Sequence, residues 1–223
     1  MKSLPYGIWH VALILLLLPG CGRLIDWGTE TFNQGEKREM SRTVINDHFR
    51  TVNVYNEFGT AGLFDILWLS NEVRTVYADL NASFHGKTTE AHKSFLRRQL
   101  AENDNFISFY VLAVVQQNVA PLGDKQSPWN IRLRVNGQLY APRDIKDVEL
   151  NPEYEYLLKD HWTRFRTVYH VKFPRKDLEG NEIITEDTKH IILHLQTIDR
   201  FDEAEWVLDE QGKLIIPLED DEA

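Results

Sequence analysis

The chain has 223 residues, of which 43% are hydrophobic and 26% are charged. This length suits one domain with a sizeable core, and the composition argues against a wholly disordered, collagen-like or coiled-coil chain. The single cysteine excludes an intrachain disulfide framework and a multi-cysteine zinc site. A formal charge of -9 argues against a general nucleic-acid binder, because neutralising phosphates needs a surplus of Lys and Arg.

Residues 1–20 have the three parts of a secretory signal peptide. Lys2 provides a positive start, and an uninterrupted apolar run extends from Val11 to Leu18. This run is shorter than the ~20 apolar residues that a membrane-spanning helix needs. The segment ends in Leu18-Pro19-Gly20-Cys21, which resembles a bacterial lipobox: Leu, a small residue, Gly or Ala, then Cys.

The resemblance to bacterial lipoproteins implies that the peptide is cut before Cys21 and that the Cys21 thiol carries a diacylglycerol. It also implies an acylated amine at the new N-terminus, with chains such as palmitate. Gly22 stands where an Asp tends to retain such proteins in the inner membrane, so the implied location is the outer membrane, facing the periplasm. Because two or more acyl chains hold a protein stably, we expect the lipid alone to anchor it. The resemblance covers about twenty residues and names no family for the globular domain.

The mature chain is expected to begin with a lipidated tether at 21–40, which is polar and carries Gly28 and Gly35. A single domain at 41–218 and an acidic tail at 219–223 are expected to follow.

The first half of the domain contains one predicted strand and two predicted helices. Val52 and Val54 alternate with polar residues and predict a strand over 49–55. Apolar residues at three- and four-residue steps then predict an amphipathic helix over about 62–83. A second helix is predicted from Thr88 to about 102, and the short turn at His85-Gly86 should join the two as an antiparallel hairpin at about 62–102.

The second half of the domain is β in character. Residues 106–115 are apolar on both faces, which predicts a central strand covered on both sides. A strand at 129–135 leads into Asn136-Gly137, which predicts a type I′ hairpin turn and a return strand at 139–140. A helical turn or wide loop is expected at 151–161, and further strands at 144–150, 165–173, 190–198, 204–208 and 214–218.

The pattern as a whole predicts a mainly β fold with an α-helical hairpin (α+β). We expect an antiparallel β-sandwich with two helices inserted after the first strand. In the strand at 165–173 the buried face is predicted to consist of Phe165, Tyr169, Val171 and Phe173, with Arg166, His170 and Lys172 facing outward.

The sequence contains none of the motifs G-x-S-x-G, H-E-x-x-H or a phosphate-binding Gly-rich loop. His190 and His194 could share a metal on a helix, but on a strand they lie ~13 Å apart, too far for one ion. The acidic stretch 199–210 lacks the spacing of a calcium loop. We therefore expect no catalytic residues, no metal site and no cofactor.

One polar pattern indicates a partner surface. If the strands at 129–135 and 165–173 are neighbours, their outward residues form a basic stripe for an acidic partner. The alternative is cross-strand pairing with acidic residues, and the two tryptophans near the strand ends can equally belong to the core. The candidate surface consists of Trp129, Arg132, Arg134, Trp162, Arg164, Arg166, His170 and Lys172.

We interpret the chain as a lipid-anchored envelope lipoprotein that acts as a non-enzymatic interaction or assembly subunit. Its expected partners are the membrane, through the acyl chains on Cys21, and another envelope protein, with no nucleic acid. The alternatives are a periplasm-facing hydrolase whose carboxylate site only the fold assembles, and a carrier of small ligands with an apolar cavity. Sandwich folds host all three functions.

Overall fold

The computed structural model describes residues 39–216 except 57–58, 116–119, 160 and 164. The chain divides into two units, residues 1–42 and 43–223. In the first unit, residues 39–42 are helical; in the second, residues 43–47 are helical and precede the strands. The signal peptide, Cys21, most of the expected tether and the acidic tail lie outside the described residues. No helix in the described part of the chain is long and apolar enough to cross a bilayer.

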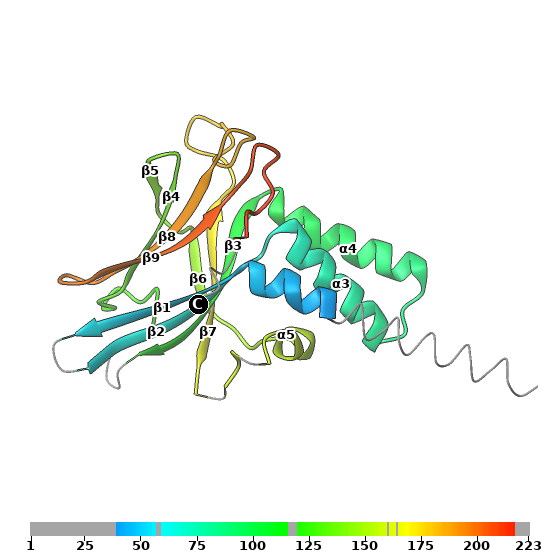
Figure 1. Cartoon of the computed structure of the whole chain (residues 1–223), viewed down its shortest axis with the longest axis horizontal. Helices are drawn as coiled ribbons and strands as arrows, with labels where there is room; N and C mark the ends of the chain where they lie inside the picture. The colour runs from blue at the N-terminus through cyan, green and yellow to red at the C-terminus, as the bar shows by residue number, and fades with distance from the viewer. Residues whose placement is uncertain (1–38, 57–58, 116–119, 160, 164, 217–223) are drawn as a thin grey trace, which may run out of the picture. The chain divides into compact units, whose positions relative to one another are not determined.

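The second unit is built on two antiparallel sheets, of five and four strands (Figure 1). Sheet A has the order β1 (Phe49–Asn56), β2 (Gly59–Trp68), β3 (Phe106–Val115), β7 (Thr167–Pro174) and β6 (Asp144–Asp147). Sheet B has the order β5 (Gln138–Tyr140), β4 (Asn130–Val135), β8 (His190–Gln196) and β9 (Phe201–Val207). The helices are α3 (Asn71–Phe84), α4 (Thr89–Asn103) and α5 (Pro152–Leu157). The predicted mainly β sandwich with a helical hairpin is confirmed.

The hairpin begins later than predicted. Residues 59–68 form β2, so the helices are inserted after the second strand and not after the first. The prediction was wrong because β2 is apolar on both faces: Phe64 and Ile66 lie between the sheets, whereas Leu67 packs under the helices. An apolar run without strict alternation has the spacing of a helix. The Ser70 hydroxyl marks the true start of α3 by accepting a hydrogen bond from the Val73 amide at 3.3 Å.

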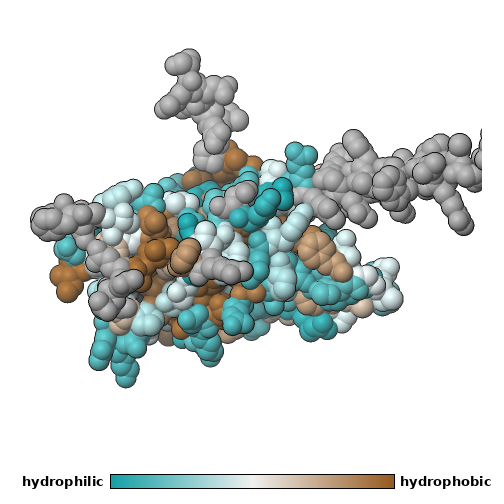
Figure 2. All heavy atoms as spheres, turned by 90° about the horizontal axis from the view of Figure 1, so that it is seen from below, coloured by the Kyte–Doolittle hydropathy of each residue, from teal (hydrophilic) through white to brown (hydrophobic). Residues whose placement is uncertain are grey.

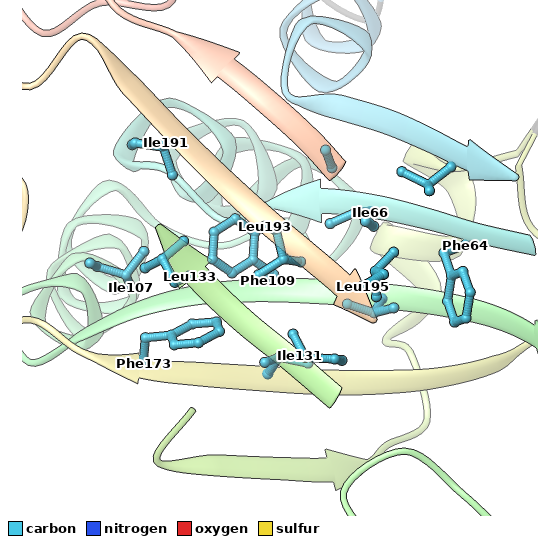
Figure 3. Packing of buried hydrophobic residues seen from close by; sticks show 14 of the residues in the cluster. Phe64, Ile66, Ile107, Phe109, Ile131, Leu133, Phe173, Ile191, Leu193 and Leu195 are labelled. Carbon is cyan, nitrogen blue, oxygen red and sulfur yellow. The ribbon is translucent and has the colours of Figure 1, made fainter. Parts of the chain in front are cut away.

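Two apolar layers hold the fold together. Between the sheets, side chains from both sheets interdigitate, among them Phe109 of β3, Leu133 of β4 and Leu193 of β8, all fully buried (Figure 3). On the other face of sheet A, α3 and α5 bury a second cluster that includes Val73 and Tyr154. Strand β3 therefore lies between two apolar layers, as its sequence predicted.

Several local predictions can be compared with the structure directly. Asn136 and Gly137 have φ values of 50° and 81°, which confirms the hairpin turn with positive φ at both positions. The predicted strands at 144–150 and 190–198 end early, at Asp147 and Gln196. The predicted strand at 204–208 begins earlier, at Phe201. The predicted strand at 214–218 is reduced, within the described residues, to an isolated bridge between Leu208 and Leu214.

The prediction of the buried and exposed faces of the strand at 165–173 was wrong in part. Phe165 is 89% exposed and lies before β7, which begins at Thr167. The predicted outer face does not point to solvent, because the helical layer covers it: Lys172 pairs with Glu102 of α4. A strand that is covered on both faces can carry polar side chains on the second face, provided that they have partners.

Candidate functional site

The predicted basic stripe does not form one surface. Strand β4 lies beside β5 and β8 in sheet B, whereas β7 lies beside β3 and β6 in sheet A. Arg132 and Arg134 are therefore in a different sheet from His170 and Lys172. Arg164 lies outside the described residues. The stripe required β4 and β7 to be neighbours, and the two strands belong to different layers.

On sheet B, charged side chains pair across the strands. Arg134 Nη2 lies 3.1 and 3.2 Å from the two carboxylate oxygens of Glu203 on β9, and His190 Nδ1 lies 2.8 Å from Glu205 Oε1. The Arg132 Nε donates to Asn130 Oδ1 at 3.1 Å. A hollow of about 480 Å³ is lined in part by Arg134, His190 and Glu205. This face of sheet B therefore contains cross-strand pairs, which were the alternative to a docking stripe.

Both candidate tryptophans pack in apolar clusters. Trp129 is 7% exposed and meets Phe64 edge to face, with ring centroids 4.7 Å apart. Trp162 is half-buried and packs against the cluster under the helices. Neither indole offers a large exposed surface to a partner.

The basic residues of β7 belong to buried and half-buried ion pairs beneath the helices. Lys172 Nζ lies 2.6 Å from Glu102 Oε1 of α4, and Arg74 Nη1 of α3 lies 3.1 Å from Glu102 Oε2. Arg74 is 2% exposed, and its Nε donates to Asn103 Oδ1 at 2.7 Å. These contacts attach both helices of the hairpin to strand β7 of sheet A. We call Arg74, Glu102, Asn103, His170 and Lys172 the polar clamp.

The surroundings of the polar clamp shift the pKa values of its members. Burial and the nearby Lys172 charge lower the pKa of His170 to about 4, so its imidazole is neutral at neutral pH. Burial acts to raise the pKa of Glu102, but the hydrogen bond from Lys172 and the charge of Arg74 outweigh it and lower this pKa below its ordinary value. Burial raises the pKa of the adjacent Tyr110 to about 12. At neutral pH the charged members of the polar clamp therefore pair with one another, which is typical of a structural role.

Arg166 takes part in a second buried ion pair on the same face of sheet A. It pairs with Asp65 of β2, which is 2% exposed and also accepts a hydrogen bond from Thr51 Oγ1 at 2.7 Å. His161 Nδ1 lies 3.8 Å from the same carboxylate. Because Arg166 neutralises a buried acid, it is not a free cation for a partner.

A second hollow is a polar cleft of about 560 Å³. It lies where β2 runs into α3 and where α4 returns into β3, and the segments after β7 and β9 complete its walls. Asn103 joins two of these walls: its Nδ2 donates to Leu69 O at 3.0 Å and to Asn71 Oδ1 at 2.9 Å. We call this hollow the hairpin cleft.

The opposite end of the sandwich carries exposed apolar side chains. The early part of β1 lies beside the late part of β9, since Trp206 Nε1 donates to His48 O at 3.0 Å and Arg50 Nε to Glu205 O at 2.8 Å. The two strands contact each other and run in opposite directions, so the end of β1 and the β8–β9 turn lie at the same end, on the left in Figure 1. Hydrophobic surface is also visible toward the left in Figure 2. We define the apolar end as Tyr55, Ile198 and Phe201, which are 59%, 101% and 51% exposed.

No family model matches the chain, and it matches no curated protein and no solved structure.

The candidate residues predicted from the sequence did not include Arg74, Glu102 or Ser108. A signal was present for Arg74, because Arg74, Tyr77 and Asn81 follow one another at helical spacing on the buried face of α3. A charged residue on such a face needs a buried partner. The identity of that partner depends on the topology, since Glu102 and Lys172 are distant from Arg74 in sequence.

Proposed function

We propose that this protein is a lipid-anchored envelope lipoprotein that serves as a non-enzymatic assembly subunit and holds another envelope protein at its apolar end. The single observation that carries the proposal is the exposure of Tyr55, Ile198 and Phe201 at one end of the sandwich. Large apolar side chains that gather at the surface favour a protein contact. The lipobox-like Leu18-Pro19-Gly20-Cys21 supports the anchor and the envelope location.

The apolar end replaces the basic stripe as the proposed contact surface. Its aromatic side chains provide large contact areas with few rotatable bonds, which is typical of the anchors of protein interfaces. The basic side chains named above are engaged in contacts within the chain, apart from Arg164, which the structure does not describe. A partner would have to break these contacts before it could use the charges.

Site-specific photo-crosslinking tests the contact surface. A photoreactive phenylalanine analogue at position 198 is expected to give a discrete crosslinked product in intact cells. The matched control is the same analogue at Leu178, which is 107% exposed and lies between β7 and β8, away from the apolar end. Equal crosslinking from both positions, or none from position 198, would contradict the proposal.

Charge insertion tests the same surface in purified material. Phe201→Asp is expected to abolish co-purification of the crosslinked partner while Leu178→Asp retains it. Retention of the partner in both variants would place its binding site elsewhere.

The anchor has a separate test. Cys21→Ser is expected to leave an unacylated precursor that no longer partitions with membranes through lipid. Unchanged acyl labelling of the variant would disprove lipidation at this residue.

A further inference from the structure

The hairpin cleft combines uncharged polar groups with aromatic side chains. Trp68 and Phe106, both half-buried, line it together with Ser70, Asn71 and Ser108. Its volume of about 560 Å³ falls within the ~300–1,000 Å³ that is typical of small-molecule sites. The cleft therefore has the size of a binding site and offers both apolar and hydrogen-bonding contacts.

A buried hydroxyl in the wall of the cleft has no partner within the described residues. Ser108 is 1% exposed, and its Oγ makes no hydrogen bond there. A buried polar group without a hydrogen-bond partner is destabilising. A hydroxyl group has the chemistry to satisfy this oxygen, since it can both donate to it and accept from it.

The charges around the cleft disfavour an anionic ligand. The lining contains three carboxylates, of Glu72, Asp104 and Glu182, against the two cations of Arg175 and Lys176. Both cations face Glu182: Arg175 Nε lies 2.7 Å from Oε2, and Lys176 Nζ lies 3.6 Å from Oε1. These two cations exceed Glu182 by one charge, and the carboxylates of Glu72 and Asp104 bring the lining to a net charge of -1, two cations against three carboxylates. Glu72 Oε2 also lies 3.8 Å from His48 Nε2. A phosphate or carboxylate ligand would meet like charge, whereas hydroxyl groups would find acceptors.

The cleft is also held in shape before any ligand arrives. Asn103, in the wall formed by α4 and β3, donates hydrogen bonds to Leu69 and Asn71 of the β2–α3 wall, and the buried Arg74 donates to the Asn103 amide oxygen. Such preorganisation reduces the ordering cost of binding.

We propose that the hairpin cleft binds a short neutral saccharide. Sugar hydroxyls would donate to Glu72 and Asp104 and satisfy Ser108, and the apolar C–H face of a sugar ring would pack on Trp68. This inference goes beyond the assembly function and does not depend on the apolar end.

Ligand-observed NMR titrations of the full-length protein test the proposal, in a detergent without a sugar headgroup. The neutral probes are cellobiose, maltose and chitobiose, with inorganic phosphate and spermidine as the anionic and cationic probes. At least one disaccharide is expected to bind saturably at millimolar concentration, and phosphate is expected not to bind. No saturable binding of any disaccharide, or binding of only phosphate or only spermidine, would overturn the proposal.

Matched variants locate the site. Glu72→Gln is expected to weaken disaccharide binding about tenfold, the value of one hydrogen bond to a charged group. Glu90→Gln is the control, because Glu72 and Glu90 both lie in the first turn of a hairpin helix but only Glu72 lines the cleft. Equal affinities in the two variants would place the saccharide elsewhere and refute the assignment.

Ser108→Ala separates binding from folding. The variant is expected to bind the disaccharide about tenfold more weakly, while its midpoint of urea unfolding without saccharide stays the same or rises, since no bond within the described residues is lost. Unchanged affinity in this variant would exclude the hydroxyl from the site.

Discussion

Lys172 Nζ lies 2.6 Å from Glu102 Oε1, and this ion pair joins strand β7 to the last turn of helix α4. Arg74 of α3 reaches the other oxygen of the same carboxylate. One half-buried acid thus connects both helices of the hairpin to sheet A. Helix α4 has no fully buried residue of its own, so its position depends strongly on these polar contacts.

Removing Arg74 is expected to destabilise the protein strongly. Arg74→Met leaves Glu102 with one cationic partner fewer and leaves Asn103 Oδ1 without its donor, which should lower the free energy of unfolding by about 3 kcal/mol. Urea unfolding followed by circular dichroism measures this change. The control is Arg98→Met on the exposed face of α4, which is expected to stay within about 0.5 kcal/mol. Equal effects would show that the polar clamp contributes little.

His170 is expected to make stability depend on pH. Its pKa falls from 6.5 to about 4 on folding, so between these values the unfolded chain binds a proton that the folded protein does not. The free energy of unfolding therefore rises with pH across this window. The contribution of His170, about 3 kcal/mol, is lost as the pH falls through the window. The imidazole is faced by Lys172 of its own strand, Glu102 and Arg74 of the helices, Asp144 of β6 and Tyr110 of β3.

The variant His170→Gln tests the pH dependence. Urea unfolding at a series of pH values is expected to show a flatter slope between pH 4 and 6.5 than in the parent protein. Glu102 acts in the same direction at lower pH, because its pKa is lowered and its contribution is lost on protonation. His190→Gln removes an exposed imidazole as the control. The same flattening in both variants would assign the effect to histidine content and not to the polar clamp.

Gly137 in the β4–β5 turn provides a test of backbone conformation alone. Gly137 has a φ of 81°, and a Cβ built there meets no atom within 4 Å. Gly137→Ala is therefore expected to cost about 1 kcal/mol through left-handed backbone strain and not through a clash. Asn136→Gly keeps the positive φ but loses the hydrogen bond from Asn136 Nδ2 to Thr188 Oγ1 at 3.2 Å, so it is expected to cost about 1 kcal/mol through that bond. Thermal unfolding of the two variants compares them, and a neutral Gly137→Ala would contradict this account.

Gly62 tests the packing around Trp129. A Cβ at position 62 would lie 2.7 Å from Phe64 Cε2 and 3.0 Å from Trp129 Cζ2. Because both rings are buried, Gly62→Ala is expected to lower the free energy of unfolding by about 1–3 kcal/mol. Adding Phe64→Leu should recover part of this loss in urea unfolding, since it removes the closer ring. Failure of the double variant to recover would indicate a backbone cause.

Local patterns in the sequence were sufficient for several elements. Apolar residues on both faces of 106–115 identified a central strand, and Asn136-Gly137 identified the hairpin turn between β4 and β5, because both features depend on neighbouring residues alone. Helix α4 was predicted within a residue at its start, since the Thr88 hydroxyl caps it by accepting from the Ala91 amide. The boundary between β2 and α3 was missed because Leu63, Phe64, Ile66 and Leu67 have a spacing that fits either state.

Sequence alone thus determined the mainly β class, the helical hairpin, the central strand and the expectation of a lipid anchor at Cys21. The single cysteine excluded an intrachain disulfide framework, and the acidic balance argued against a general nucleic-acid binder, without any coordinates. Tertiary structure decided which charges meet. Arg134 and Lys172 have similar sequence surroundings, yet one lies on the outer face of sheet B and the other beneath the helices. Strand order is set by contacts between segments that are distant in sequence. The residues of a single strand therefore do not indicate which segments cover it.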